Sequence, residues 1–235
     1  MREGRYHFPM KQFVQALSGR AEFLIVVLGS LGLSLLSNLQ VVLDPAIADR
    51  LPPFTNETLV SNVVYELFVL VWLGAFMRAR GWTLERLGFG ITLRDTSIGV
   101  LLAIIVFCAV WVIEQVLGSA APTMLEAARR FDKVSGELDL WTILLSSAVD
   151  SVFEELFVCA YVISALKEKR RAAFALNVSV ALRVGCHVYQ GLYGVLIGGA
   201  LGLVFGYWYL KSGRIWPLLV AHAGLQVVEL LMLSP

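Results

Sequence analysis

Residues 150–161 read DSVFEELFVCAY and place three acidic side chains in a segment that is otherwise apolar. A charged side chain at the centre of a bilayer costs about 2.5–3.5 kcal/mol, so it usually faces a protein interior or a water-filled cavity and marks function. Because residues three or four apart share a helix face, Asp150 and Glu154 lie on one side, whereas Glu155 lies about 100° around the helix. The stretch therefore predicts a membrane helix with carboxylates on two neighbouring faces.

The composition of the whole chain indicates an integral membrane protein. Of 235 residues, 58% are hydrophobic and only 16% are charged, a balance that is not typical of soluble domains. The net charge of +1 comes from basic clusters scattered between apolar runs, so we expect no nucleic-acid partner. Cys108, Cys159 and Cys186 all fall in apolar runs and form no CxxC pair, which predicts free thiols.

Seven stretches approach the roughly 20 apolar residues that are needed to cross a hydrocarbon core about 30 Å thick. They are residues 21–44, 60–77, 96–118, 141–165, 172–190, 192–210 and 215–233. Polar or basic connectors fall where these stretches end. The prediction is an all-α, polytopic membrane protein with about seven transmembrane helices. A single transmembrane domain at 21–235 would follow a cytoplasmic segment at 1–20.

Two further patterns concern the packing of these helices. Residues 119–140 contain a short amphipathic segment that could lie on the membrane surface or cap a cavity, with a solvated connector as the alternative. Glycines recur every four residues at Gly194, Gly198, Gly202 and Gly206. Small residues at this spacing let membrane helices pack closely, which predicts a structural role for this face.

The basic residues indicate how the chain lies in the membrane. Most of the 19 Lys and Arg residues fall on one side if the N-terminus is inside, so we expect a multi-pass protein of the cell membrane with a cytoplasmic N-terminus. Arg183 is an exception, because it lies inside the fifth stretch. A lone arginine at this depth needs an acidic partner, and Glu154 and Glu155 are the expected ones.

The adjacent glutamates are the strongest candidates for chemistry. One carboxylate can act as a general base while the other orients it or binds an ion; a structural ion pair with Arg183 is the alternative. His187 has Arg183 one turn back, and His222 has Gln226 one turn ahead on its face. Two imidazoles at membrane depth beside acids favour a functional site over simple packing. We interpret two other intramembrane acids, Glu66 and Glu114, as structural.

Three sequence features resemble the motifs of the CAAX-protease and bacteriocin-processing family of intramembrane proteases, over about residues 85–232. They are the Glu154-Glu155 pair, His187 on the next helix, and the run GRIWPLLVAH that ends at His222. The family patterns are EExxxR, FxxxH and HxxxN or HxxxD. This chain departs from them at Cys159, Arg183 and Gln226.

The resemblance implies an intramembrane endopeptidase that cleaves a hydrophobic or lipidated peptide, either prenylated CAAX-type or bacteriocin-like, in contact with membrane lipid. Glu154 or Glu155, helped by His187, would activate water, and His222 and Gln226 would stabilise the oxyanion. In a zinc version His187, His222 and Glu154 would hold the ion; a metal-free glutamate mechanism is the alternative. Cys159 stands where the family pattern has an arginine, and Arg183 on the adjacent helix would supply the guanidinium instead. The short chain is similar to the prokaryotic branch, which implies a prokaryotic cell membrane.

Two other hypotheses remain open from the sequence. The motif departures favour a catalytically silent scaffold or chaperone of the same fold, and the buried acids and histidines could form an ion or proton pathway. A geometric problem also remains, because straight helices would leave Glu154, His187 and His222 at unequal depths. Helix tilt or shifted helix ends must bring them together if they share a site.

Overall fold

The structure is a computed structural model that describes residues 14–167 and 170–234. The predicted cytoplasmic segment at 1–20 therefore lies largely outside the described residues. The described residues form helices and no strand, apart from an isolated bridge between Phe54 and Val134. The long helices are α2 (Gly19–Leu43), α3 (Asn56–Ala79), α4 (Leu93–Ala120), α6 (Leu140–Glu154), α8 (Ala172–His187), α9 (Gly191–Ser212) and α10 (Trp216–Leu233). The short ones are η1 (Pro45–Arg50), α5 (Pro122–Arg129), η2 (Glu155–Tyr161), α7 (Val162–Lys167) and η3 (Val188–Gln190). The all-α prediction is confirmed.

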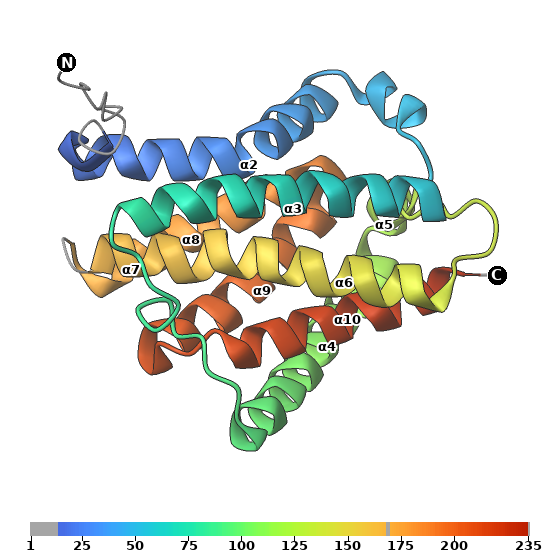
Figure 1. Ribbon diagram of the computed structural model, residues 1–235. Helices are drawn as coiled ribbons and strands as arrows, with labels where there is room; N and C mark the ends of the chain where they lie inside the picture. Colours follow the sequence, from blue (N-terminus) through green and yellow to red (C-terminus); the bar gives the residue numbers. More distant parts are fainter. Residues whose placement is uncertain (1–13, 168–169, 235) are drawn as a thin grey trace, which may run out of the picture.

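Five helices in the described part of the chain are long and apolar enough to cross a membrane, and one of them covers Ala172–Ser212. This run turns back at Gly191, whose φ of 68° suits a glycine, and so forms the two adjacent helices α8 and α9. The elements α6, η2 and α7 make one further continuous rod (Figure 1). The seven apolar stretches thus correspond to seven helical rods in the described chain.

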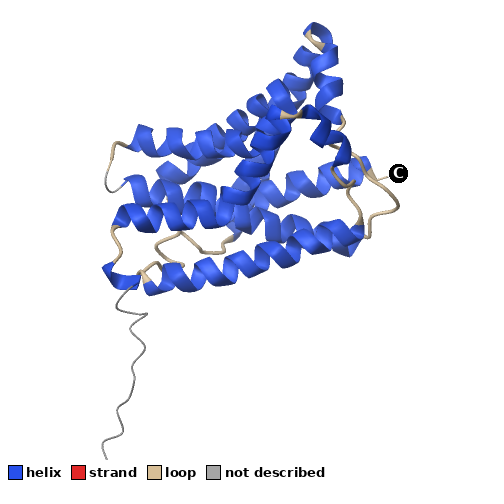
Figure 2. Cartoon of the chain, turned by 90° about the horizontal axis from the view of Figure 1, so that it is seen from above, coloured by secondary structure: helices blue, strands red, loops and turns tan. Residues whose placement is uncertain are grey.

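The outer surface of the bundle fits a lipid environment. Large apolar side chains such as Phe68, Val71 and Leu203 are exposed along the rods, whereas a soluble monomer rarely exposes large contiguous apolar patches. The loops lie mainly at the two ends of the rods (Figure 2). This arrangement is that of an integral membrane protein, because loops in contact with lipid would leave backbone groups without hydrogen bonds.

The glycines of α9 pack directly against α8, as their spacing predicts. A side chain at Gly198 would meet the backbone of Val184, and one at Gly202 would meet Val180. The approach brings α8, and with it Arg183, close to the middle of the bundle. The small-residue face of α9 therefore has a structural role that positions the fifth stretch.

The rod that carries the acidic stretch changes its geometry at Glu155, where seven residues form a wider π-helix. The amide of Val162 donates to the carbonyl of Cys159, and the Ser179 hydroxyl of α8 donates to the carbonyl of Val158 at 2.7 Å. At the far end, Tyr161 packs against Trp82 and lies 3.4 Å from Glu22 of α2. Neighbouring helices therefore hold the π segment at both its middle and its end. Single-turn π segments inside α-helices are frequent at functional sites.

The predicted amphipathic segment is present as α5. Leu125 and Ala128 are buried and lie in a cluster with Leu117 of α4 and Tyr193 of α9. Met124, in contrast, is exposed. The helix covers one end of the bundle, beside the junction of α8 and α9 (Figure 1).

Candidate active site

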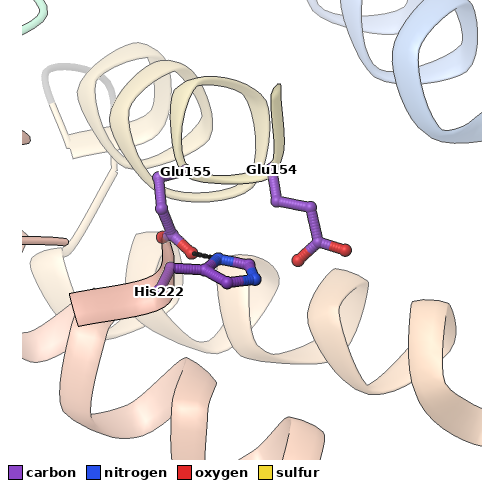
Figure 3. A group of neighbouring side chains, drawn as sticks. All are labelled: Glu154, Glu155 and His222. Carbon is purple, nitrogen blue, oxygen red and sulfur yellow. Dashed lines mark hydrogen bonds and ion pairs between the residues drawn. The ribbon is translucent and has the colours of Figure 1, made fainter. Parts of the chain in front are cut away.

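Four charged or titratable side chains from three rods meet inside the bundle. Glu154 ends α6 and Glu155 begins η2, while Arg183 comes from α8 and His222 from α10. Figure 3 shows the two carboxylates on either side of the imidazole ring of His222. Straight helices were expected to leave the acidic pair and His222 at unequal depths. In the structure the side chains of Glu155 and His222 are in direct contact.

Arg183 joins the two glutamates, as its isolation in an apolar stretch predicts. Its Nη1 donates to Oε2 of Glu154 at 2.8 Å, and its Nη2 donates to Oε1 of Glu155 at 2.6 Å. The guanidinium has no exposed surface and lies 5.8 Å from the centre of the Phe205 ring. Both acids are therefore bound to one cation in a place from which water is largely excluded.

His222 binds the same glutamate from the other side. Its Nδ1 lies 2.7 Å from Oε1 of Glu155, and because a carboxylate only accepts, Nδ1 carries the proton in this hydrogen bond. The second ring nitrogen, Nε2, lies 3.9 Å from Oδ2 of Asp150. This nitrogen faces the side of the site on which the Glu154 carboxylate also lies (Figure 3).

The two adjacent glutamates differ in what they can do. Glu155 is fully buried, and its Oε1 accepts from both Arg183 and His222. The Glu154 side chain is 19% exposed, and within the described residues its one hydrogen-bond partner is Arg183, through Oε2. Glu154 thus has a carboxylate oxygen that is open to another molecule, whereas Glu155 is held in place by its neighbours.

His187 occupies a different position from the one expected. Its Nδ1 lies 2.9 Å from the carbonyl oxygen of Arg183 in its own helix. Within the described residues, the group whose donor atoms lie within 4.8 Å of one another contains Glu154, Glu155 and His222, and not His187. The expected zinc ligand set of His187, His222 and Glu154 stays a prediction, and the structure places His187 outside the group that the other two residues form. The reason is local: α8 ends at His187 and a 3₁₀ turn follows.

Gln226 lies one turn after His222, as predicted, and its amide is next to the carboxylate of Asp150. Its Oε1 is buried and has no hydrogen-bond partner among the described residues. Asp150 also interacts with Glu66 of α3. Sequence reasoning left Asp150 out of the candidate site and treated Glu66 as structural. Asp150 shares a helix face with Glu154, and this spacing could have placed it in the candidate site. No pattern around Glu66 in the sequence pointed to the site.

The donor atoms of this group fit a zinc ion poorly. Two carboxylates and one imidazole could serve as ligands, but both carboxylates already bind the guanidinium of Arg183. A divalent ion placed among them would lie beside a buried positive charge, which is electrostatically unfavourable. The groups available for chemistry at this site are therefore the protein's own side chains.

Comparison with known proteins gives one finding for this chain. Residues 136–228 match the model of the family described as type II CAAX prenyl endopeptidase, Rce1-like. No curated protein and no solved structure matches the chain. The matching segment carries both glutamates, Arg183 and His222, and it excludes Glu66. Over this segment the chain is similar to the Rce1-like type II CAAX prenyl endopeptidases, as the sequence motifs predicted.

Proposed function

We propose that this protein is an intramembrane endopeptidase that hydrolyses one peptide bond of a membrane-associated peptide. The observation that carries the proposal is the buried group formed by Glu154, Glu155, Arg183 and His222 inside a membrane bundle. The family match supports a membrane protease in the same segment. Acids that lipid normally excludes are tolerated here because they bind a guanidinium and an imidazole.

In this proposal Glu154 is the general base that takes a proton from the attacking water. A base needs a lone pair that no other donor occupies, and Glu154 has an uncommitted oxygen and some exposure. Glu155 is a positioning residue, because it holds both Arg183 and His222. The Nδ1 proton of His222 is held by Glu155, so in this proposal His222 acts as an imidazolium whose Nε2 donates a hydrogen bond to the scissile carbonyl oxygen.

The substrate class follows from the surroundings of the site. A peptide bond can reach acids inside the bundle only if the substrate itself enters the membrane, which favours hydrophobic or lipidated peptides. A farnesylated peptide with a C-terminal CAAX sequence is the first probe because of the family match; bacteriocin-like peptides are the second.

The test compares wild-type protein with Glu154→Gln in lipid vesicles that contain a farnesylated, fluorogenic CAAX peptide. We expect the amide to lower the rate about 10²–10⁴-fold, the usual contribution of general acid–base catalysis. Glu126→Gln is the matched control, because Glu126 is an exposed acid of α5. Cleavage that survives Glu154→Gln at the wild-type rate would exclude Glu154 as the base.

One observation favours a second function, a catalytically silent scaffold that binds hydrophobic peptides. Arg183 binds both glutamates, an arrangement that could also be a purely structural ion pair. A scaffold would bind the farnesylated peptide without releasing a fragment. Hydrolysis that depends on Glu154 would dispose of this alternative.

A further inference from the structure

We infer that the first turns of α4 hold His222 of α10 at the depth of Glu155. Three residues there act as positioning residues, and together we call them the α4 anchor: Asp95, Thr96 and Gly99. They share one face of α4, because residues three or four apart lie on the same side of a helix. All three lie outside the segment that matches the family model. Their role rests on the proposed peptidase function, since it concerns the imidazole of the same site.

An ion pair binds the chain just before α10 to the α4 anchor. Nη1 of Arg214 donates to Oδ2 of Asp95 at 2.5 Å. The Asp95 side chain is 3% exposed, and the hydroxyl of Thr92 donates to the same oxygen at 2.8 Å. The carboxylate is therefore a fixed point for Arg214, because a buried charge is unfavourable without its partners.

Two further contacts hold α10 against the same face of α4. Nε1 of Trp216, the first residue of α10, donates to Oγ1 of Thr96 at 2.9 Å. A Cβ atom at Gly99 would lie 2.8 Å from the carbonyl oxygen of Pro217 and 2.7 Å from Cβ of Val220. The two helices can approach this closely only because Gly99 has no side chain. Contacts on both sides of Pro217 thus restrict sliding and rotation of α10.

The position of α10 matters because His222 follows these contacts closely. It lies six residues after Trp216, about 9 Å along the helix axis at 1.5 Å per residue. Nδ1 of His222 lies 2.7 Å from Oε1 of Glu155, and N–H···O hydrogen bonds extend to only about 3.2 Å. A shift of α10 by about 1 Å would break this contact, and a misplacement of that size can cost about 10²-fold in rate.

The experiment moves α10 with a single methyl group. Gly99→Ala places a Cβ atom against the backbone of α10, which must give way. Gly118→Ala in the same helix is the matched control, because a Cβ atom there would meet only Leu125, at 3.7 Å. Both changes remove a helix glycine, which favours the helix by up to about 1 kcal/mol, so they differ in what they do to α10.

Proton NMR of protein labelled with ¹⁵N-histidine, in detergent micelles, measures the Nδ1 proton of His222 directly. A proton between an imidazole and a carboxylate resonates far downfield, and His222→Gln identifies the signal. We expect Gly99→Ala to remove this signal or move it upfield, and Gly118→Ala to leave it at the wild-type position. In vesicles, Gly99→Ala should lower kcat for the farnesylated CAAX peptide about 10²-fold with little change in KM, because the interaction lost is made in the transition state.

The double change Arg214→Met with Trp216→Phe is the second variant if Gly99→Ala does not fold. It loosens the α4 anchor without inserting an atom, and it should weaken the same signal with a smaller loss of cleavage. A wild-type His222 signal in both variants would overturn the positioning role even if their stability falls, because a purely structural contact does not move the ring. If wild-type protein cleaves no peptide, the peptidase proposal fails, whereas the NMR comparison still decides the role of the α4 anchor.

Discussion

Arg183 has no exposed surface and bears a full positive charge in the middle of a membrane bundle. Two carboxylates at 2.6 and 2.8 Å compensate that charge, and Cys159 on the glutamate rod lies 3.9 Å away. The cysteine occupies the position where the resembling family has its arginine, one turn after Glu155. Arg183 therefore delivers a guanidinium to the same carboxylates from the neighbouring helix.

Arg183→Met should strongly destabilise the protein, because it leaves two buried carboxylates without their cation. Removing one partner of a buried ion pair typically costs about 3–5 kcal/mol. Arg129→Met is the control, since Arg129 is exposed on α5 and a surface change of this kind usually costs less than about 0.5 kcal/mol. Unfolding in SDS mixed micelles, followed by circular dichroism, measures both. Similar stability of the two variants would contradict the role of the ion pair.

At the residue scale the sequence predicted the partners of Arg183, because a buried arginine needs acidic partners and few acids lie in the apolar stretches. It could not predict that the His187 ring lies against the carbonyl of Arg183, because the ring orientation depends on how α8 ends. It also could not predict that Glu66 lies near Asp150, because this depends on how α3 packs against α6.

At the scale of elements, the acidic rod is most deeply buried where it forms the π segment. All seven of its residues are buried, and the burial continues into Val162 and Ile163 of α7. The hydroxyl of Ser179 meets the carbonyl of Val158 within this segment. A hydrogen bond from α8 thus stabilises the local geometry next to Glu155.

Ser179→Ala should therefore destabilise the π segment. It leaves the buried carbonyl of Val158 without this donor, and an unsatisfied buried group costs about 1–3 kcal/mol. Ser146→Ala is a close control, because Ser146 is also buried but its hydroxyl bonds to Ile143 within its own helix. Thermal unfolding in detergent should show a larger decrease for Ser179→Ala. An equal decrease would mean that Ser179 does not support the segment.

The elements also show which features a sequence can predict. The four-residue glycine repeat of α9 predicted close packing because only small residues allow two backbones to approach, and Gly198 and Gly202 do meet α8. The π segment could not be predicted from local periodicity, and the hydrogen bond that supports it joins residues that are 21 positions apart. Local periodicity is visible in the sequence, whereas tertiary hydrogen bonds are not.

At the scale of the whole molecule, α2 begins and α10 ends at opposite ends of the bundle (Figure 1). Seven rods therefore place the start of α2 and the end of α10 on opposite sides of a membrane. The excess of Lys and Arg in the connectors favours a cytoplasmic N-terminus and an external C-terminus. The orientation remains a prediction from the sequence.

Fusions of alkaline phosphatase, which is active only outside the cytoplasm, test this orientation in bacterial cells. We expect activity when the enzyme follows α10 and none when it follows Gly213, in the loop between α9 and α10. The two fusion points lie on either side of one helix, so they control for each other. The reverse pattern of activity would show that the C-terminus is cytoplasmic.

The central claim is that Glu154 activates water against a peptide bond inside the membrane. Mass spectrometry of the products formed in ¹⁸O-labelled water tests it most directly, with purified protein and the farnesylated CAAX peptide in vesicles. The account predicts one ¹⁸O atom in the new C-terminal carboxylate for the wild type and for Glu126→Gln, and almost no product for Glu154→Gln. Absence of a labelled fragment with wild-type protein, or equal labelling with Glu154→Gln, would contradict it.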